Sequence, residues 1–140
     1  MKFIAIAALT LLLNSLATAD TLVVIANPKA GFDSLSLAET RQLYLGKNRR
    51  LPDAQTAMPV MPQEKNPTRI NFERLVLNRD PKQSRAYWAQ MIFTGRGTPP
   101  RQLDSDEQVK QEVAANPQAI GYINRRALDK SVKAVLVIEQ

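Results

Sequence analysis

The feature of this sequence that most constrains its fold is a set of short, β-branched apolar runs separated by longer amphipathic segments. Apolar runs of about four to eight residues bounded by turn signals are typical of strands, whereas helices need longer periodic segments. An alternation of the two patterns is typical of α/β proteins, in which helices cover a sheet. Four strands are therefore predicted, over residues 21–26, 57–61, 119–123 and 134–138.

Helices are predicted where capping residues precede segments with helical spacing. Residues 36–39 (SLAE) and 105–108 (SDEQ) match the capping box, whose first and fourth residues satisfy each other's backbone donors. Gly46 is a stop signal, and Pro67 suits the first turn of a helix. Helices are predicted over residues 36–45, 67–78 and 81–93, and from 105 to the stop at Asn116-Pro117, with loops over 47–56 and 94–101.

These patterns together predict a three-layer α/β sandwich, with a mixed, mostly parallel sheet flanked by helices. Trp88, Met91 and Ile92 share one face of the helix over 81–93. This spacing favours Trp88 as a core residue over a stacking platform for a base or a sugar.

The first nineteen residues have the pattern of a secretory signal peptide. Lys2 is followed by an apolar stretch over 3–13, and residues 17–19 (ATA) have the small-x-small form of a cleavage site. The apolar stretch is shorter than the roughly 20 residues of a membrane span, and the alternative is an uncleaved anchor or a buried helix. Cleavage after Ala19 leaves one domain, residues 20–140, with a charge of 18 − 13 = +5. Because no cysteine follows the apolar stretch, a lipoprotein anchor is not expected. No later segment is expected to span a membrane, and the predicted location of the protein is the periplasm.

The composition excludes much of the usual catalytic chemistry. The chain has no histidine and no cysteine, so Ser-His-Asp, Cys-His and HExxH sites, thiolate zinc sites and disulfides are all ruled out. No constellation for a reaction, a metal or a cofactor is found, and a non-enzymatic protein is predicted. The net charge of +6 raises the question of a nucleic-acid partner, but export argues against one. Arg49-Arg50, Arg125-Arg126 and the glycine- and arginine-containing loop over 95–101 are read as solvated surface, with an anion-binding role as the alternative.

Four segments of the chain resemble, in order, one lobe of the phosphate-binding proteins of ABC transporters, which have the type II periplasmic-binding-protein-like fold. The last of them carries Gln118 where the family usually has glycine. Full-length members are roughly twice this size and hold their ligand between two lobes, so the resemblance implies a single-lobe member. The segments are 23–28 (VVIANP), 36–47 (SLAETRQLYLGK), 67–77 (PTRINFERLVL) and 109–123 (VKQEVAANPQAIGYI).

The resemblance implies a ligand loop directly before the helix that begins near Pro67. In the family this loop reads approximately R-x-D-G-S-G-T, and its hydroxyls and amides meet phosphate at a helix N-terminus, where free N–H groups and the helix dipole favour an anion. Here Glu64 stands in place of the aspartate, Asn66 in place of the serine, and Thr68 keeps the hydroxyl. The candidate anion ligands are therefore Glu64, Asn66, Thr68 and Arg69.

This loop also departs from the family pattern. Pro62 replaces the arginine, and Pro67 replaces a glycine and removes one N–H donor. Lys65 and Arg69 are the cations that could restore positive charge from a different geometry. Under the simplest alternative, Asn66 or Thr68 only caps the helix.

Two functions follow from these observations. The first is an exported, non-enzymatic substrate-binding-like protein that takes phosphate or a related oxyanion, with an ABC permease as its partner. The second is a single-lobe interaction or regulatory module that has lost tight ligand binding and docks onto a protein of the cell envelope.

Overall fold

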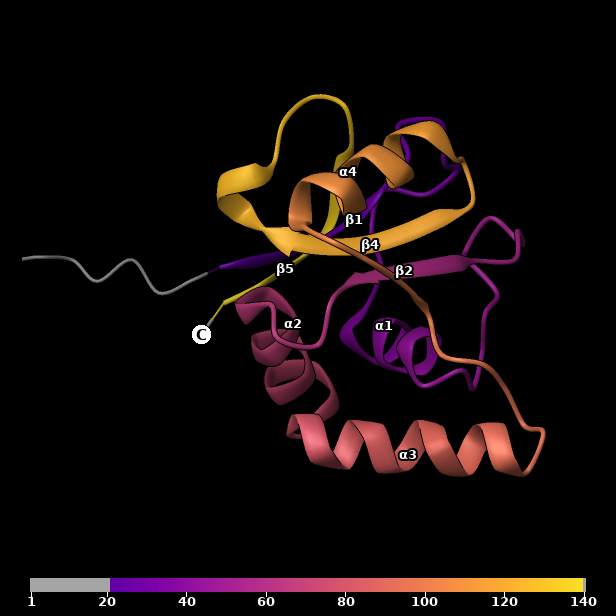
Figure 1. Ribbon diagram of the computed structural model, residues 1–140. Helices are drawn as coiled ribbons and strands as arrows, with labels where there is room; N and C mark the ends of the chain where they lie inside the picture. The colour runs from indigo at the N-terminus through magenta and orange to yellow at the C-terminus, as the bar shows by residue number, and fades with distance from the viewer. Residues whose placement is uncertain (1–20, 140) are drawn as a thin grey trace, which may run out of the picture.

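The computed structural model describes residues 21–139, so the predicted signal peptide, residues 1–19, lies outside the described part. Within it, no helix is long and apolar enough to cross a membrane. The helices and strands follow the predicted order, with one additional short strand near residue 102 (Figure 1). The elements are β1 (Leu22–Ala26), α1 (Leu37–Tyr44), β2 (Met58–Pro62), α2 (Pro67–Phe72), the π-helical turn η1 (Glu73–Leu77), α3 (Pro81–Phe93), β3 (Arg101–Leu103), α4 (Asp106–Ala115), β4 (Ala119–Asn124), the 3-10 turn η2 (Arg125–Ala127) and β5 (Lys133–Ile138).

The five strands form one mixed sheet in the order β3-β2-β4-β1-β5. β2 pairs in parallel with both β3 and β4, whereas β1 pairs antiparallel with both β4 and β5. Both antiparallel pairings therefore involve β1, and the other four strands all run in one direction. The prediction of a mixed, mostly parallel sheet is confirmed in this sense.

Helices cover both faces of the sheet, which confirms the three-layer arrangement. Because side chains alternate along a strand, Leu22, Val24 and Ala26 of β1 belong to one core cluster, whereas Val23 and Ile25 belong to the other. The first cluster packs under α1, α2 and η1, and the second packs under α4 (Figure 1). All five residues of β1 are buried, as expected for a strand enclosed on both faces.

The predicted caps are present, with one difference. Ser36 and Glu39 form the reciprocal capping box at the start of α1, and Gly46 follows the helix with a φ of +71°, which glycine adopts without strain. Ser105 caps α4 by accepting a hydrogen bond from the Gln108 backbone, but the Gln108 side chain accepts from the backbone of Asp104 instead of Ser105. The second capping box is therefore only half formed.

The helix α3 lies farther from the sheet than its sequence predicts. Figure 1 shows it along the outer side of α1, and Ser84 is its one fully buried residue. The prediction that Trp88 belongs to the core is wrong, because its side chain is only half-buried. The indole packs over Gly46, where an added Cβ would lie 3.1 Å from Trp88 Cη2. The loop predicted over 94–101 also ends one residue early, because Arg101 begins β3.

Candidate functional site

The predicted ligand loop lies at the edge of the sheet where β2, β3 and β4 end. Since these three strands run in the same direction, their carboxyl ends meet at this edge. The helices α2 and α4 both begin there, with Asn66 and Ser105 as their N-cap residues. In α/β sheets, this edge is where ligands commonly bind. We call residues 63–68, 104–106 and Asn124 the carboxyl edge.

A carboxylate of the chain itself occupies the centre of the carboxyl edge. Thr68 Oγ1 donates to Asp106 Oδ2 at 2.8 Å, and Asn66 Nδ2 donates to Asp106 Oδ1 at 3.1 Å. The backbone N–H of Asn124 donates to Asp106 Oδ2 at 2.8 Å. Asn66 Oδ1 also accepts from the Thr68 backbone at 2.8 Å, which is the expected helix cap. The two predicted donors therefore meet on one oxyanion, and that oxyanion is the Asp106 carboxylate.

The predicted cation of the site faces the protein interior. Arg69 and Glu73 are both buried and form an ion pair, with 2.8 Å between Arg69 Nε and Glu73 Oε1. A second guanidinium nitrogen of Arg69 donates to the carbonyl of Pro62 at 3.3 Å. Separating a buried ion pair leaves an uncompensated charge, which is strongly unfavourable. In this arrangement the charge of Arg69 is neutralised by Glu73 and is not presented at the edge.

The fourth predicted residue, Glu64, is engaged elsewhere. Its carboxylate forms an ion pair with Arg85 of α3, and both side chains are partly exposed. Such exposed pairs contribute little to stability. Of the four candidates, the structure thus brings Asn66 and Thr68 together, whereas Glu64 and Arg69 point to other partners.

Two residues of the carboxyl edge could not be identified from the sequence. Asp106 has the signature of an ordinary first-turn acid of α4, and Asn124 contributes a backbone N–H that every non-proline residue has. Only the order of the strands places the start of α4 opposite the start of α2. The one sequence signal for Asp106 is the serine- and aspartate-containing start of α4, which is interpreted in the sequence analysis as a helix cap.

An aromatic cluster supports α2 from the core side. The rings of Phe72 and Tyr122 are stacked with 3.7 Å between their centroids, and Tyr44 packs edge-on against both. Tyr44 Oη donates to the Val60 carbonyl at 2.9 Å, whereas Tyr122 Oη is buried and has no hydrogen-bond partner among the described residues. Burial raises the pKa of Tyr44 and of Tyr122 well above the ordinary value. Tyr122 therefore serves as a core residue, with its hydroxyl enclosed in the protein.

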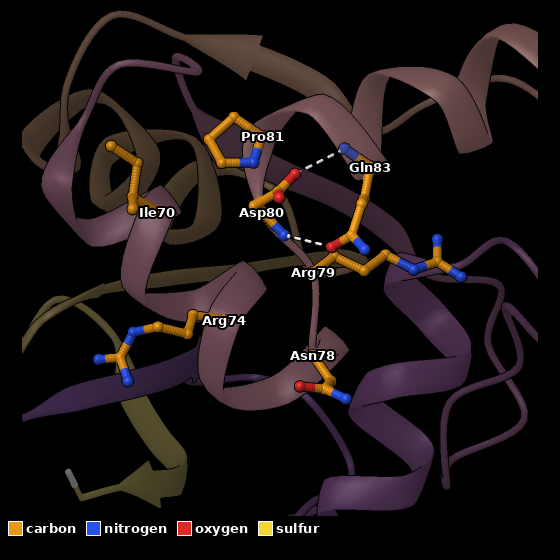
Figure 2. A pocket seen from close by; sticks show the side chains of 7 residues that line it. All are labelled: Ile70, Arg74, Asn78, Arg79, Asp80, Pro81 and Gln83. Carbon is orange, nitrogen blue, oxygen red and sulfur yellow. Dashed lines mark hydrogen bonds between the residues drawn. The ribbon is translucent and has the colours of Figure 1, made fainter.

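A cavity of about 240 Å³ lies away from the carboxyl edge, between η1 and the start of α3 (Figure 2). Arg74 and Arg79 line it, but Figure 2 shows their side chains pointing away from one another. The polar groups of Asp80 and Gln83 are used in a capping box for α3, which is not among the capping boxes predicted from the sequence. The cavity thus lacks the convergent polar groups typical of a small-molecule site. Among residues 21–139 there is also no group of acidic side chains that could hold a metal ion.

Comparison with known proteins identifies the fold. No family model and no curated protein matches the chain. An ABC-type phosphate transport receptor from Vibrio cholerae is similar at a TM-score of 0.67 and 22% identity, over 84% of this chain and 46% of the receptor. A phosphate ABC transporter substrate-binding structure with bound phosphate from Clostridium perfringens gives the same TM-score and identity, over 84% of this chain and 45% of the other. PstS from Borrelia burgdorferi is similar at a TM-score of 0.62 and 14% identity, over 87% and 47%.

This chain therefore spans about half the length of the solved structures that it resembles. The similarity runs through most of the chain, whereas the identity is low. As the sequence resemblance implied, the fold is that of one lobe of the phosphate-binding proteins of ABC transporters.

Proposed function

We propose that this chain is an exported, non-enzymatic binding lobe that acts as an interaction module in the cell envelope, with its oxyanion position held by its own Asp106. The observation that carries the proposal is the convergence of Thr68, Asn66 and the Asn124 backbone on the Asp106 carboxylate. In this proposal the anion-binding position of the fold is filled by the Asp106 carboxylate, whose hydrogen bonds join α2, β4 and α4. Its partner would then be a macromolecule of the envelope.

The energetics favour this proposal over tight phosphate binding. A phosphate at the same donors must displace Asp106, and each hydrogen bond to a charged group contributes roughly 1.5–3 kcal/mol. If phosphate bound beside the carboxylate instead, like charges about 4 Å apart would repel by about 1–4 kcal/mol. A penalty of about 3 kcal/mol lowers affinity by roughly a hundredfold. Arg69 offsets none of this while it is paired with Glu73.

Phosphate or oxyanion binding is the second candidate function. It is favoured by the similarity of the fold to phosphate-binding proteins, one of them solved with bound phosphate. In this candidate, Asp106 turns outward and Glu64, Asn66, Thr68 and Arg69 line the ligand, with an ABC permease as the partner. The shared feature of both candidates is a lobe without catalytic chemistry.

A thermal-shift titration with inorganic phosphate and with sulfate distinguishes the two candidates. Binding at a hundred times the dissociation constant stabilises a protein by about 2.7 kcal/mol. The interaction module predicts little or no shift for the native chain at about 1 mM of either anion, and a larger, phosphate-dependent shift in Asp106→Ala. A shift of the native chain at micromolar phosphate that Thr68→Val abolishes would instead establish the second candidate. Glu107→Gln, one residue away and exposed, is the matched control.

A further inference from the structure

Two segments of this protein contain basic residues and no acidic residue. Residues 45–50 and 81–98 contain six lysines and arginines and no acidic residue, whereas the rest of residues 20–140 contains twelve basic and thirteen acidic residues. The two segments thus carry the whole surplus of the predicted mature chain. This concentration was not visible from the net charge alone.

The two segments lie against each other and form one surface, which we call the α3 face. Arg49 donates from its guanidinium to the Thr98 carbonyl at 2.9 Å, and Tyr87 Oη donates to the Leu45 carbonyl at 2.6 Å. Trp88 packs over Gly46 between these two contacts. In Figure 1, α3 is the outermost helix on this side of the sheet, opposite α4.

Three basic side chains of the α3 face are available to a partner. Lys47, Arg50 and Arg96 are exposed, and no salt bridge within residues 21–139 involves them. Arg85 is the one member of the face that pairs with an acid, Glu64. An uncompensated positive surface attracts anionic partners over about one Debye length.

Two exposed apolar side chains lie at the end of α3, within the same segment as Arg96. Phe93 is 91% exposed and Ile92 is 55% exposed, and they lie next to the turn at Gly95 that leads to Arg96. Exposed apolar side chains combined with lysines and arginines are typical of segments that lie in a membrane interface.

We propose that the α3 face binds anionic phospholipid membranes, with Phe93 and Ile92 entering the headgroup region and Lys47, Arg50 and Arg96 contacting lipid phosphates. An anionic lipid surface fits these observations because it offers both phosphates for the unpaired cations and an apolar layer for the exposed side chains of Ile92 and Phe93. This binding does not depend on the carboxyl edge, so either proposal can fail alone.

Vesicle binding tests the proposal directly. The protein as purified from cells, with its N-terminal residue determined by mass spectrometry, is mixed with vesicles of phosphatidylcholine alone or with about 30% phosphatidylglycerol and separated by flotation. The expected result is binding only to the anionic vesicles, weakened by salt. Because Trp88 is the one tryptophan of the chain, its fluorescence is an independent readout of contact.

Variants locate the binding surface. Lys47→Glu with Arg96→Glu should lower the partition constant by about 25-fold or more, since each basic residue contributes about fivefold. Phe93→Ser should lower it by about tenfold. The matched control, Lys29→Glu with Lys130→Glu, makes the same change in net charge with side chains outside the α3 face, and should lower it by no more than about threefold.

Two results would overturn the proposal. The first is failure of the native protein to bind anionic vesicles at about 0.1 M salt. The second is an equal loss of vesicle binding in the control variant, which would mean that net charge alone accounts for the binding. If vesicle binding fails, cross-linking of a Phe93→Cys variant to an envelope protein would assign the face to a protein partner. The absence of native cysteine makes that label specific to one site.

Discussion

Removal of the Asp106 carboxylate should destabilise the fold more than removal of the Glu107 carboxylate, the other acidic group in the first turn of α4. Asp106→Ala leaves Thr68 Oγ1, Asn66 Nδ2 and the Asn124 N–H without the acceptor that they share. The carboxylate is half-buried, so water replaces part of each lost bond. A discount to about 1 kcal/mol per bond gives a loss of about 3 kcal/mol.

Urea unfolding followed by Trp88 fluorescence and circular dichroism measures this loss, and the same change should lower Tm by roughly 10 °C. Glu107→Gln is the control, because Glu107 is exposed and pairs only with Lys110 among the described residues; it should change stability by less than about 0.5 kcal/mol. A double-mutant cycle with Thr68→Val should show a coupling of about 1 kcal/mol.

The reasoning would be refuted by either of two outcomes. Equal effects of Asp106→Ala and Glu107→Gln would mean that the hydrogen bonds at the carboxyl edge add nothing beyond first-turn charge. A coupling near zero with Thr68→Val would mean that Thr68 and Asp106 do not interact in solution.

Three further predictions concern the core and the surface. Tyr44→Phe should cost about 1 kcal/mol because it removes a buried hydrogen bond, whereas Tyr122→Phe should be neutral or stabilising because its hydroxyl has no partner among residues 21–139; urea unfolding of both variants checks this, and a larger loss for Tyr122→Phe would contradict it. Gly121→Ala should cost about 2 kcal/mol or more, since a Cβ there would lie 2.5 Å from a methyl carbon of α4; an unchanged Tm would show that α4 can shift freely. The hydrogen bond from Lys110 lowers the pKa of Asp129 in the folded state. This pair therefore stabilises the fold above the ordinary carboxyl pKa of about 4, and its contribution is lost as the pH falls below that value. The Tm difference between the native chain and Asp129→Asn should shrink in acid, and a constant difference from neutral pH to about pH 2 would contradict the prediction.

The elements of this fold could be predicted from local signals. β1 is a run of β-branched residues, and the start and stop of α1 are marked by Ser36, Glu39 and Gly46. Such signals act over a few residues and survive in any tertiary context. The short strand β3 was missed because its three residues, RQL, carry neither apolar alternation nor β-branched character.

The candidate site was predictable only in part, because its geometry depends on contacts far apart in the sequence. Thr68 and Asp106 are 38 positions apart and meet through the strand order. Arg69 turns inward because Glu73, one helical turn later, offers a buried partner. The prediction that Trp88 lies in the core is wrong because apolar spacing predicts which face of a helix is apolar, but not how deeply the helix is buried.

Calorimetric titration of inorganic phosphate into the native chain and into Asp106→Ala, side by side, tests most directly whether Asp106 fills the oxyanion position. We predict no binding to the native chain tighter than about 1 mM, and affinity at least about tenfold higher in Asp106→Ala. Micromolar binding by the native chain, with the same or weaker binding by Asp106→Ala, would contradict the account.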